Sequence, residues 1–427
     1  MTATLLSLPS ELLDQILSVL PAEDLAALSQ TCKRVYVHTQ DEHIWKCLLQ
    51  DHVPGCVLDA PPQGQSFRKL YQAFHPHWFL TKHKIWFSDE ANTGNILIAR
   101  FSPRRQTIEA YRLVAERRFG TWFNWENELG VAIHEFDPYV RLHLDDPVVR
   151  LKQPLEYQTH NTLSSTPSDR YHGEVRMEAQ GPHSTRHGTF FLARKMLPER
   201  QTPQMALWPP HTIRMSERVR NESQEQFRGD GNKPVRSSEA SLHHFRLRRW
   251  LEWGRVNLGM STNTFSTLLP ELYTPTRQKP WRGIWIGDYA PHGCEFLLMY
   301  QPDDESIPGS EPSGDGQTED ETPYHGFIEA IKLTGDPNVP RGECTFIAED
   351  IGNGGLIRNV EDGAFKGAKI VKSKGHIASS GFIDDTWMET QLIIISNDKL
   401  AHYWSEFDHI SFYHRVDIDQ FLTPEED

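Results

Sequence analysis

The spacing of apolar residues predicts three short amphipathic helices in the first 56 residues of the chain. Leu12, Ile16 and Leu17 recur at helical spacing and give the first helix one apolar face. Pro21 separates this helix from a second, because proline interrupts the helical hydrogen-bond pattern. Asp41 is a suitable N-cap for a third helix. The apolar residues of the second and third helices are Leu25, Leu28, Ile44, Trp45 and Leu48.

Residues 171–423 show a different pattern, in which short β-type runs alternate with turns rich in Gly, Pro and Asp. The run Gly283–Tyr289 is followed by Cys294–Tyr300 across a four-residue turn, and Leu392–Ser396 is followed by Lys399–Trp404 across an Asn-Asp pair. Such pairs of runs predict antiparallel hairpins. Many short strands with few helical stretches favour an antiparallel sandwich or barrel over an α/β fold.

One stretch of this second part has helical spacing. Within residues 242–256, Leu242, Phe245, Trp250 and Trp253 recur as on one helix face, which predicts an accessory helix with a basic side. The fold class expected is therefore α+β, a small three-helix module followed by a larger, mainly antiparallel sandwich or barrel. The expected parts are residues 1–56 (helical module), 57–130 (aromatic-rich linker or bridge) and 131–427 (antiparallel β domain).

Composition excludes several classes of protein. The chain has 427 residues, of which 58 are acidic and 44 basic, and the net charge of −14 argues against a nucleic-acid-binding role. No apolar run is long enough to span a membrane, and the first residues do not resemble a signal peptide. Five cysteines in so long a chain favour reduced thiols, hence the cytoplasm or the nucleus. Two polar inserts, 216–241 and 302–321, are expected to be mobile loops.

The motifs of common catalytic and metal centres are missing from the sequence. The 21 histidines have no accompanying Cys pair with metal-ligand spacing, and no phosphate-binding loop, dinucleotide fingerprint or nucleophile elbow is present. We therefore expect no metal, no cofactor and no catalysis by this chain itself.

The N-terminal helices carry more apolar surface than they can bury among themselves. A unit of about 45 residues rarely folds without a partner or a staple. Two interpretations are open: the helices form a cap packed on the rest of the chain, or their apolar stripe is a docking face for another protein.

The sequence of this region, LPSELLDQILSVLPAEDLAALSQTCKRVYVHTQDEHIWKCLL (residues 8–49), closely resembles the F-box family. The resemblance implies that the module binds a Skp-type adaptor, which connects it to a cullin–RING ubiquitin ligase. It also implies which residues face the adaptor, with Trp45 fixing the third helix and contributing more to the core than to the contact. These residues are Leu5, Leu8, Pro9, Leu12, Ile16, Leu17, Leu20, Leu25 and Trp45.

Several later phrases resemble the substrate-binding domain of the F-box only protein 31 family. They are QGPHSTRHGTFFL (180–192), RRWLEWGR (248–255), WRGIWIGDYAPHGCEFLL (281–298), IKLTGDPNVPRGE (331–343), KGHIASSGF (374–382) and HISFYHRV (409–416). The resemblance implies an antiparallel β-barrel whose mouth receives the C-terminal tail of a target protein for ubiquitylation and degradation. The two inserts depart from the family pattern, and no family pocket could be matched residue by residue.

Candidate substrate-binding residues come from the turns of these phrases and from the basic stretch. Loops at the rim of a barrel often collect binding residues. For the histidines the alternative is a ring hydrogen-bonded to a carbonyl beside a turn, and for the arginines it is solvation or pairing with Glu252. A guanidinium could instead hold a carboxylate. The candidates are His183, Arg248, Arg249, Tyr289, His292 and His376.

Two functional hypotheses follow. In the first, the chain is the substrate-recognition subunit of a Skp–cullin–F-box ubiquitin ligase. In the second, it is a small-molecule binding or hydrolytic β-barrel for which the helices form a non-docking cap. They differ in whether Leu8, Leu12 and Ile16 are left exposed by the rest of the chain.

Overall fold

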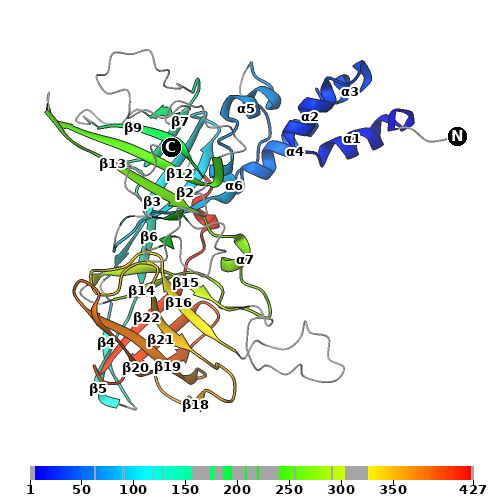
Figure 1. Ribbon diagram of the computed structural model, residues 1–427. Helices are drawn as coiled ribbons and strands as arrows, with labels where there is room; N and C mark the ends of the chain where they lie inside the picture. Colours follow the sequence, from blue (N-terminus) through cyan, green and yellow to red (C-terminus); the bar gives the residue numbers. More distant parts are fainter. Residues whose placement is uncertain are drawn as a thin grey trace, which may run out of the picture.

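A computed structural model describes residues 5–61, 64–88, 90, 92–118, 120–126, 128–155, 174–177, 186–194, 207–208, 219–220, 240–253, 256–289, 292–302 and 326–424. Short helices cover one face of a nine-stranded sheet, and a closed β-barrel adjoins the opposite face (Figure 1). Within the described ranges, no helix is long and apolar enough to cross a membrane. The predicted inserts lie outside these ranges, apart from residues 219–220, 240–241 and 302.

The N-terminal region contains four helices in place of the three predicted. The 3-10 turn η1 (Leu5–Ser7) is followed by α1 (Ser10–Ser18), α2 (Ala22–Ser29), α3 (Lys33–His38) and α4 (Glu42–His52). Cys32 is extended, with φ −158°, and separates α2 from α3. The side chain of Asp41 accepts a hydrogen bond from the His43 amide at 2.8 Å, which confirms the predicted cap. Two further helices, α5 (Phe67–Phe74) and α6 (Phe79–His83), pack on the sheet.

The first large sheet has the strand order β6-β3-β2-β1-β13-β12-β9-β8, and β7 pairs with β3. Along β2, Ile96 and Ile98 face the barrel, while Leu97 and Ala99 face the helices, so the strand is apolar on both sides. The strands are β1 (Ile85–Ser88), β2 (Ile96–Ser102), β3 (Thr107–Arg117), β6 (Pro138–Leu142), β7 (Val149–Lys152), β8 (Val175–Met177), β9 (Arg186–Arg194), β12 (Ala240–Trp253) and β13 (Val256–Ser266).

The helix predicted over 242–256 is wrong, because residues 242–253 belong to β12 and Val256 begins β13. Strand β12 is a central strand that pairs antiparallel with both β9 and β13. Phe245 and Leu247 are buried beneath the helices, and Arg246 and Arg248, which alternate with them along the strand, are buried as well. A strand that is buried on both faces does not alternate between apolar and polar residues, so its two-residue period cannot be seen in the sequence. The large residues of this strand happen to be spaced as on a helix, and this spacing led to the wrong prediction.

The second large sheet closes into a barrel of eight strands. Its order is β17-β16-β15-β14-β22-β21-β20-β19, and pairing of β17 with β19 completes the ring, while β18 (Leu356–Asn359) extends it at β19. The two predicted hairpins are confirmed as β14–β15 and β20–β21. The barrel strands are β14 (Gly283–Asp288), β15 (Cys294–Tyr300), β16 (Ile328–Lys332), β17 (Cys344–Ala348), β19 (Lys369–Ser379), β20 (Ile383–Ile394), β21 (Lys399–Trp404) and β22 (His409–Arg415).

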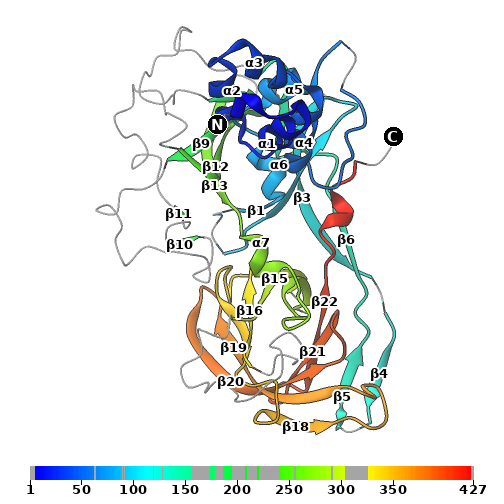
Figure 2. The same ribbon diagram turned by 90° about the vertical axis from the view of Figure 1, so that its right-hand side faces the viewer.

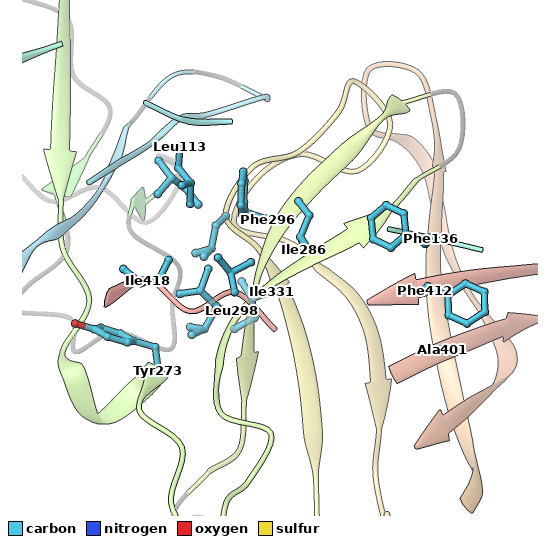
Figure 3. Packing of buried hydrophobic residues seen from close by; sticks show 14 of the residues in the cluster. Leu113, Phe136, Tyr273, Ile286, Phe296, Leu298, Ile331, Ala401, Phe412 and Ile418 are labelled. Atoms are coloured by element: carbon cyan, nitrogen blue, oxygen red, sulfur yellow. The ribbon is translucent and has the colours of Figure 1, made fainter. Parts of the chain in front are cut away.

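A continuous hydrophobic core joins the first sheet to the outer wall of the barrel. Figure 3 shows Leu113 of the first sheet near Phe296 and Leu298 of the barrel, with Ile418 beside them. The short helix α7 (Pro270–Tyr273) lies at the same junction. The ribbon of β4 (Trp122–Trp125) and β5 (Glu128–His134) extends from β3 and β6 along the barrel (Figure 2).

The predicted parts do not coincide with the structural ones. Residues 57–130 are not a linker, since they supply α5, α6 and central strands of the first sheet. The closed barrel begins only at Gly283. The described strands between residue 131 and β13 belong to the first sheet, to its ribbon or to the separate pair of β10 (Leu207–Trp208) and β11 (Val219–Arg220). Hydrophobic alternation identifies strands but does not say which of two antiparallel sheets a strand joins.

The last described segment returns from the barrel to the helical end of the molecule. The Arg100 guanidinium of β2 donates to the Thr423 carbonyl at 3.2 Å, and the Thr423 hydroxyl donates to the Gly55 carbonyl at 2.7 Å. Gly55 has φ +76° and lies against the Leu422 side chain. These contacts connect the end of the helical module to the chain that leaves the barrel.

Candidate functional site

A pocket of about 360 Å³ opens at one end of the barrel, where strand ends and turns converge. Below it the barrel interior is filled with fully buried side chains, so the pocket has a closed floor. Its wall includes Tyr289, His292, Lys332, Asp336, Asn338, Thr345, His376, Trp404, Phe407, His409 and Ser411. The buried residues beneath include Trp285, Leu297, Phe346, Leu392 and Tyr413.

Two glycines inside the barrel make room for the large rings around the pocket. A Cβ on Gly375 would lie 2.7 Å from Cη2 of Trp404. A Cβ on Gly287 would lie 2.7 Å from the Tyr413 ring and 2.8 Å from the Tyr289 ring. Real Cβ atoms do not approach neighbours so closely, so these strand positions accept only glycine without rearrangement.

The inner wall of the pocket contains a buried charge cluster. The Lys332 ammonium lies 2.7 Å from the Glu295 carboxylate and 2.7 Å from the Asp336 carboxylate. It also lies 4.3 Å from the ring centroid of Tyr289, whose hydroxyl donates to the Thr345 hydroxyl at 2.9 Å. Only 1% of the Lys332 side chain is exposed, so its charge is balanced within the protein.

The two carboxyls have opposite pKa shifts. Burial raises the pKa of Glu295 to about 8, and Lys332 opposes this only in part. Burial also acts to raise the pKa of Asp336, but hydrogen bonds with Glu295 and Lys332 outweigh it and lower the pKa to about 2. At neutral pH the cluster therefore holds one ammonium, one carboxylate and one largely neutral carboxyl.

Asp336 also shapes the loop that forms one lip of the pocket. Its carboxylate accepts hydrogen bonds from the backbone amides of Asn338 at 2.6 Å and Val339 at 2.9 Å. The loop is held from outside by the turn between β1 and β2, since the Gly335 amide donates to the Thr93 carbonyl at 2.9 Å. The first sheet therefore helps to position the pocket.

His376 forms part of the opposite lip. Its Nδ1 lies 2.9 Å from the Cys344 carbonyl and its Nε2 lies 3.1 Å from the Asp385 carboxylate. Its ring stacks on Trp387, with centroids 4.5 Å apart and an interplanar angle of 6°. These contacts fix the imidazole, which is 5% exposed, against Trp387 and Asp385 of β20.

The structure brings three of the six predicted substrate-binding residues, Tyr289, His292 and His376, into this one pocket. His183 lies outside the described residues. Arg248 and Arg249 lie in the first sheet, away from the pocket. Arg248 is 2% exposed and lies 3.1 Å from Glu174. The strand β12 places this side chain inside the protein, whereas a helix would have left it exposed.

Sequence reasoning missed Lys332, Asp336 and Phe407. A lysine inside the apolar run Ile328–Leu333 was the available signal, because a strand buried on both faces accepts a lysine only with a charge partner. Asp336, four residues later at a turn, is that partner.

The second candidate surface is the outer side of η1 and α1. Leu5, Leu12 and Ile16 are 46%, 46% and 40% exposed, and Pro9 is exposed as well. Leu8 and Leu20 are half-buried. Leu17, Leu25 and Trp45 are instead buried in the core that joins the helices to the first sheet.

Contacts from α3 hold this surface in place. The Arg34 guanidinium donates to the carbonyls of Leu6 at 2.6 Å and Leu8 at 3.0 Å. His38 Nδ1 lies 2.7 Å from the Asp14 carboxylate of α1. The apolar side chains of η1 and α1 are therefore presented on a backbone that is already ordered.

Comparison with known families identifies both regions. Residues 5–51 match the F-box-like family, and residues 265–420 match the cyclin D1 binding domain. The second match spans α7 and all strands of the barrel, and so it includes the described pocket.

Curated relatives match over part of the chain. Protein EXECUTER 2, chloroplastic, of Arabidopsis thaliana is 30% identical over 155 residues, which are 35% of this chain and 23% of that protein. Its Oryza sativa counterpart is 28% identical over 180 residues, 42% of this chain and 26% of that protein. The chain thus spans about a quarter of the length of these relatives. A Nostoc punctiforme structure from the DUF3598 family, of unknown function, aligns over 78% of this chain and 94% of its own at 10% identity, but its TM-score of 0.14 is too low to inform the fold.

Proposed function

We propose that this chain, which carries an F-box-like domain and a cyclin D1 binding domain forming a β-barrel, is the substrate receptor of a Skp–cullin–F-box ubiquitin ligase. It would dock a Skp-type adaptor through η1 and α1 and capture the C-terminal tail of a target protein in the barrel pocket. The observation that carries the proposal is the exposed apolar face of α1.

The adaptor-docking part of the proposal rests on the two apolar sides of α1, one buried and one exposed. Leu13 and Leu17 are buried at 0% and 1% exposure, while Leu12 and Ile16 point outward. A helix that needed only to cap its own protein would carry polar residues on its outer face. Transfer of two such side chains from water into an interface stabilises a complex by about 2–4 kcal/mol.

The tail-capture part rests on the shape of the pocket. Its floor is closed, so an extended chain cannot pass through it, whereas a chain end can enter. The wall offers hydroxyl and amide groups for hydrogen bonds to a chain end, from Asn338, Thr345 and Ser411. Lys332 and Asp336 also line the pocket, but their charges are already matched to each other. The volume of about 360 Å³ is within the range of small-ligand pockets and is sufficient for a few atoms of backbone and one side chain.

The fold between the two surfaces would contribute to function by fixing their geometry. The helices pack on one face of the first sheet and the barrel on the other, and the C-terminal segment joins both ends through Arg100 and Thr423. A target held in the pocket would then stay at a constant distance from the adaptor. Constant positioning raises the effective concentration of the target lysine near the ubiquitin-loaded enzyme.

The transfer chemistry would belong to the partners. In the described part of the chain, no group of three or more His, Cys, Asp or Glu side chains could hold a metal ion. Cys344 is buried and its thiol pKa is raised by that burial and by Glu329, which makes it a poor nucleophile. The five cysteines are free thiols, which fits the proposed location in the cytoplasm or nucleus.

The alternative of a small-molecule barrel with a helical cap has less support. Every residue that lines the described pocket comes from the barrel domain, and the N-terminal helices lie on the far side of the first sheet. Those helices therefore do not serve as a lid for this pocket.

The experiment that tests the proposal is quantitative proteomics in cells that lack the chain. Cells are complemented with the wild type, with Leu12→Asp/Ile16→Asp, or with a pocket variant, Lys332→Met. Proteins that accumulate without the chain should fall only with the wild type and should share a C-terminal feature. Equal rescue by all three would contradict the proposal, and so would a set of proteins with unrelated C-termini.

A further inference from the structure

The outward face of β20 beside the pocket carries an alternation of acidic and aromatic residues. Asp385, Trp387 and Glu389 occupy every second position, so their side chains lie on one face of the strand. Asp385 contacts His376, which is the cross-strand partner of Trp387 and lines the pocket. The stripe is thus continuous with the pocket wall.

Trp387 has one face covered and the other open. His376 stacks on it at 4.5 Å, and 40% of the Trp387 surface is nonetheless exposed. An open indole face attracts a lysine or arginine side chain, and nearby carboxylates strengthen that attraction. A strand with only a structural role would not be expected to leave a tryptophan exposed between two acids.

The charges around Trp387 are mainly negative. Glu406 and Asp408 lie in the turn that carries the pocket residue Phe407, and both are exposed. On the neighbouring strand Lys374 lies opposite Glu389, but its ammonium is 2.7 Å from Glu349. The surface therefore complements a basic partner.

We infer that the open face of Trp387, flanked by Asp385 and Glu389, binds a lysine or arginine side chain of the target, in the stretch that precedes the terminus held in the pocket. The inference rests on the proposed function, because the pocket must hold the terminus for the preceding residues to reach β20. It adds a sequence preference: a basic residue shortly before the C-terminus.

The test uses the full chain in complex with its adaptor and two pools of ten-residue peptides. Both pools have randomised last three residues, and one carries arginine at the preceding four positions while the other carries the neutral isostere citrulline. The wild type should retain the arginine pool about fivefold to tenfold more strongly at low salt, and less so at high salt. Glu389→Lys should remove the preference without weakening retention of the citrulline pool.

Two further variants separate the explanations. Glu361→Lys makes the same charge change in the exposed loop before β19, at the opposite end of that strand from His376, and should keep the preference. Trp387→Leu should reduce the preference even though all carboxylates remain. If the wild type retains both pools equally, or if Glu361→Lys and Glu389→Lys behave alike, the basic subsite is refuted while tail capture stands. If no pool is retained by the wild type, the proposed tail capture fails and the subsite with it.

Discussion

The α1 face and the barrel pocket present opposite kinds of surface to their proposed partners. On α1, Leu12 and Ile16 are 46% and 40% exposed, and their contribution would come from burial in a complex. In the pocket, Lys332 is 1% exposed and its charge partners are already in place. One surface is incomplete until a partner covers it, whereas the other is assembled by the fold before any ligand arrives.

This difference determines what each surface can discriminate. Apolar burial is non-directional, so the α1 face depends on shape and area and tolerates small changes in a partner. Buried polar groups accept only a ligand that satisfies their hydrogen bonds, because an unmatched group costs free energy. A constant adaptor suits the first surface, and a selected chain end suits the second.

The largest expected effect comes from polar substitution on the α1 face. Leu12→Asp/Ile16→Asp should reduce affinity for a Skp-type adaptor by at least about a hundredfold, because two charges would have to be buried in the interface. Co-purification and titration with the adaptor measure this. Val57→Asp places a charge at another exposed apolar position, 76% exposed, and should leave adaptor binding unchanged. Undiminished binding of the double variant would remove the docking role of α1.

Removal of the pocket ammonium tests the second surface. Lys332→Met leaves Asp336 charged and unpaired in a buried site, and we expect a loss of about 3–5 kcal/mol in the free energy of unfolding. Urea denaturation measures it. The matched control is Lys366→Met, because Lys366 lies 3.9 Å from Asp362 with 73% of its side chain exposed, and its loss should cost less than about 0.5 kcal/mol. Similar costs for both would show that the buried cluster does not stabilise the barrel.

The two surfaces were not equally predictable from sequence. The α1 face follows from local periodicity, because a helix places residues three and four apart on one side. The hairpins β14–β15 and β20–β21 also follow from local turn chemistry. Tyr289, His292 and His376 could be proposed for a pocket because each lies beside a glycine-containing turn.

The features that could not be predicted depend on contacts between residues that are far apart in sequence. Lys332 is paired with Glu295 across β15 and β16, two strands that pair with each other although the acidic insert 302–321 separates them in sequence. The sequence predicts an exposed Arg248, because nothing near it in sequence indicates its ion pair with Glu174. Local spacing gave β12 the wrong period, because both of its faces are buried and its large residues are spaced as on a helix.

A glycine substitution tests whether the pocket wall is already fully packed. Gly375→Ala puts a methyl group against the Trp404 ring, and overpacking of this kind costs about 1–3 kcal/mol. Thermal unfolding measures the loss, and binding of tail peptides should weaken in parallel because Trp404 lines the pocket. Gly130→Ala is the control, since nothing lies within 4 Å of its Cβ position. Unchanged stability of Gly375→Ala would mean that Trp404 can move and that the wall adapts to its ligand.

The smallest effect is a dependence of stability on pH that comes from Glu295. Its pKa is raised from 4.5 to about 8 by burial, so between these values the folded state binds more protons than the unfolded state. The contribution of Glu295 to the free energy of unfolding should therefore fall as pH rises through this window, by about 1 kcal/mol per pH unit. Buried histidines act in the opposite direction below about pH 6.5, because burial lowers the pKa of His77 and of His414 to about 4. Glu295→Gln keeps a neutral side chain at all pH values, so the difference in free energy of unfolding between the wild type and this variant should fall from pH 5 to pH 8 in urea denaturation. Glu361→Gln, at an exposed position, should retain the slope. Asp336, with its pKa lowered to about 2, acts in a separate window: its stabilising contribution is lost only as pH falls from about 3.8 toward 2. If the wild-type and Glu295→Gln profiles run parallel between pH 5 and pH 8, Glu295 is ionised in the folded protein, and the pocket then carries a net negative charge in place of the balanced one described above.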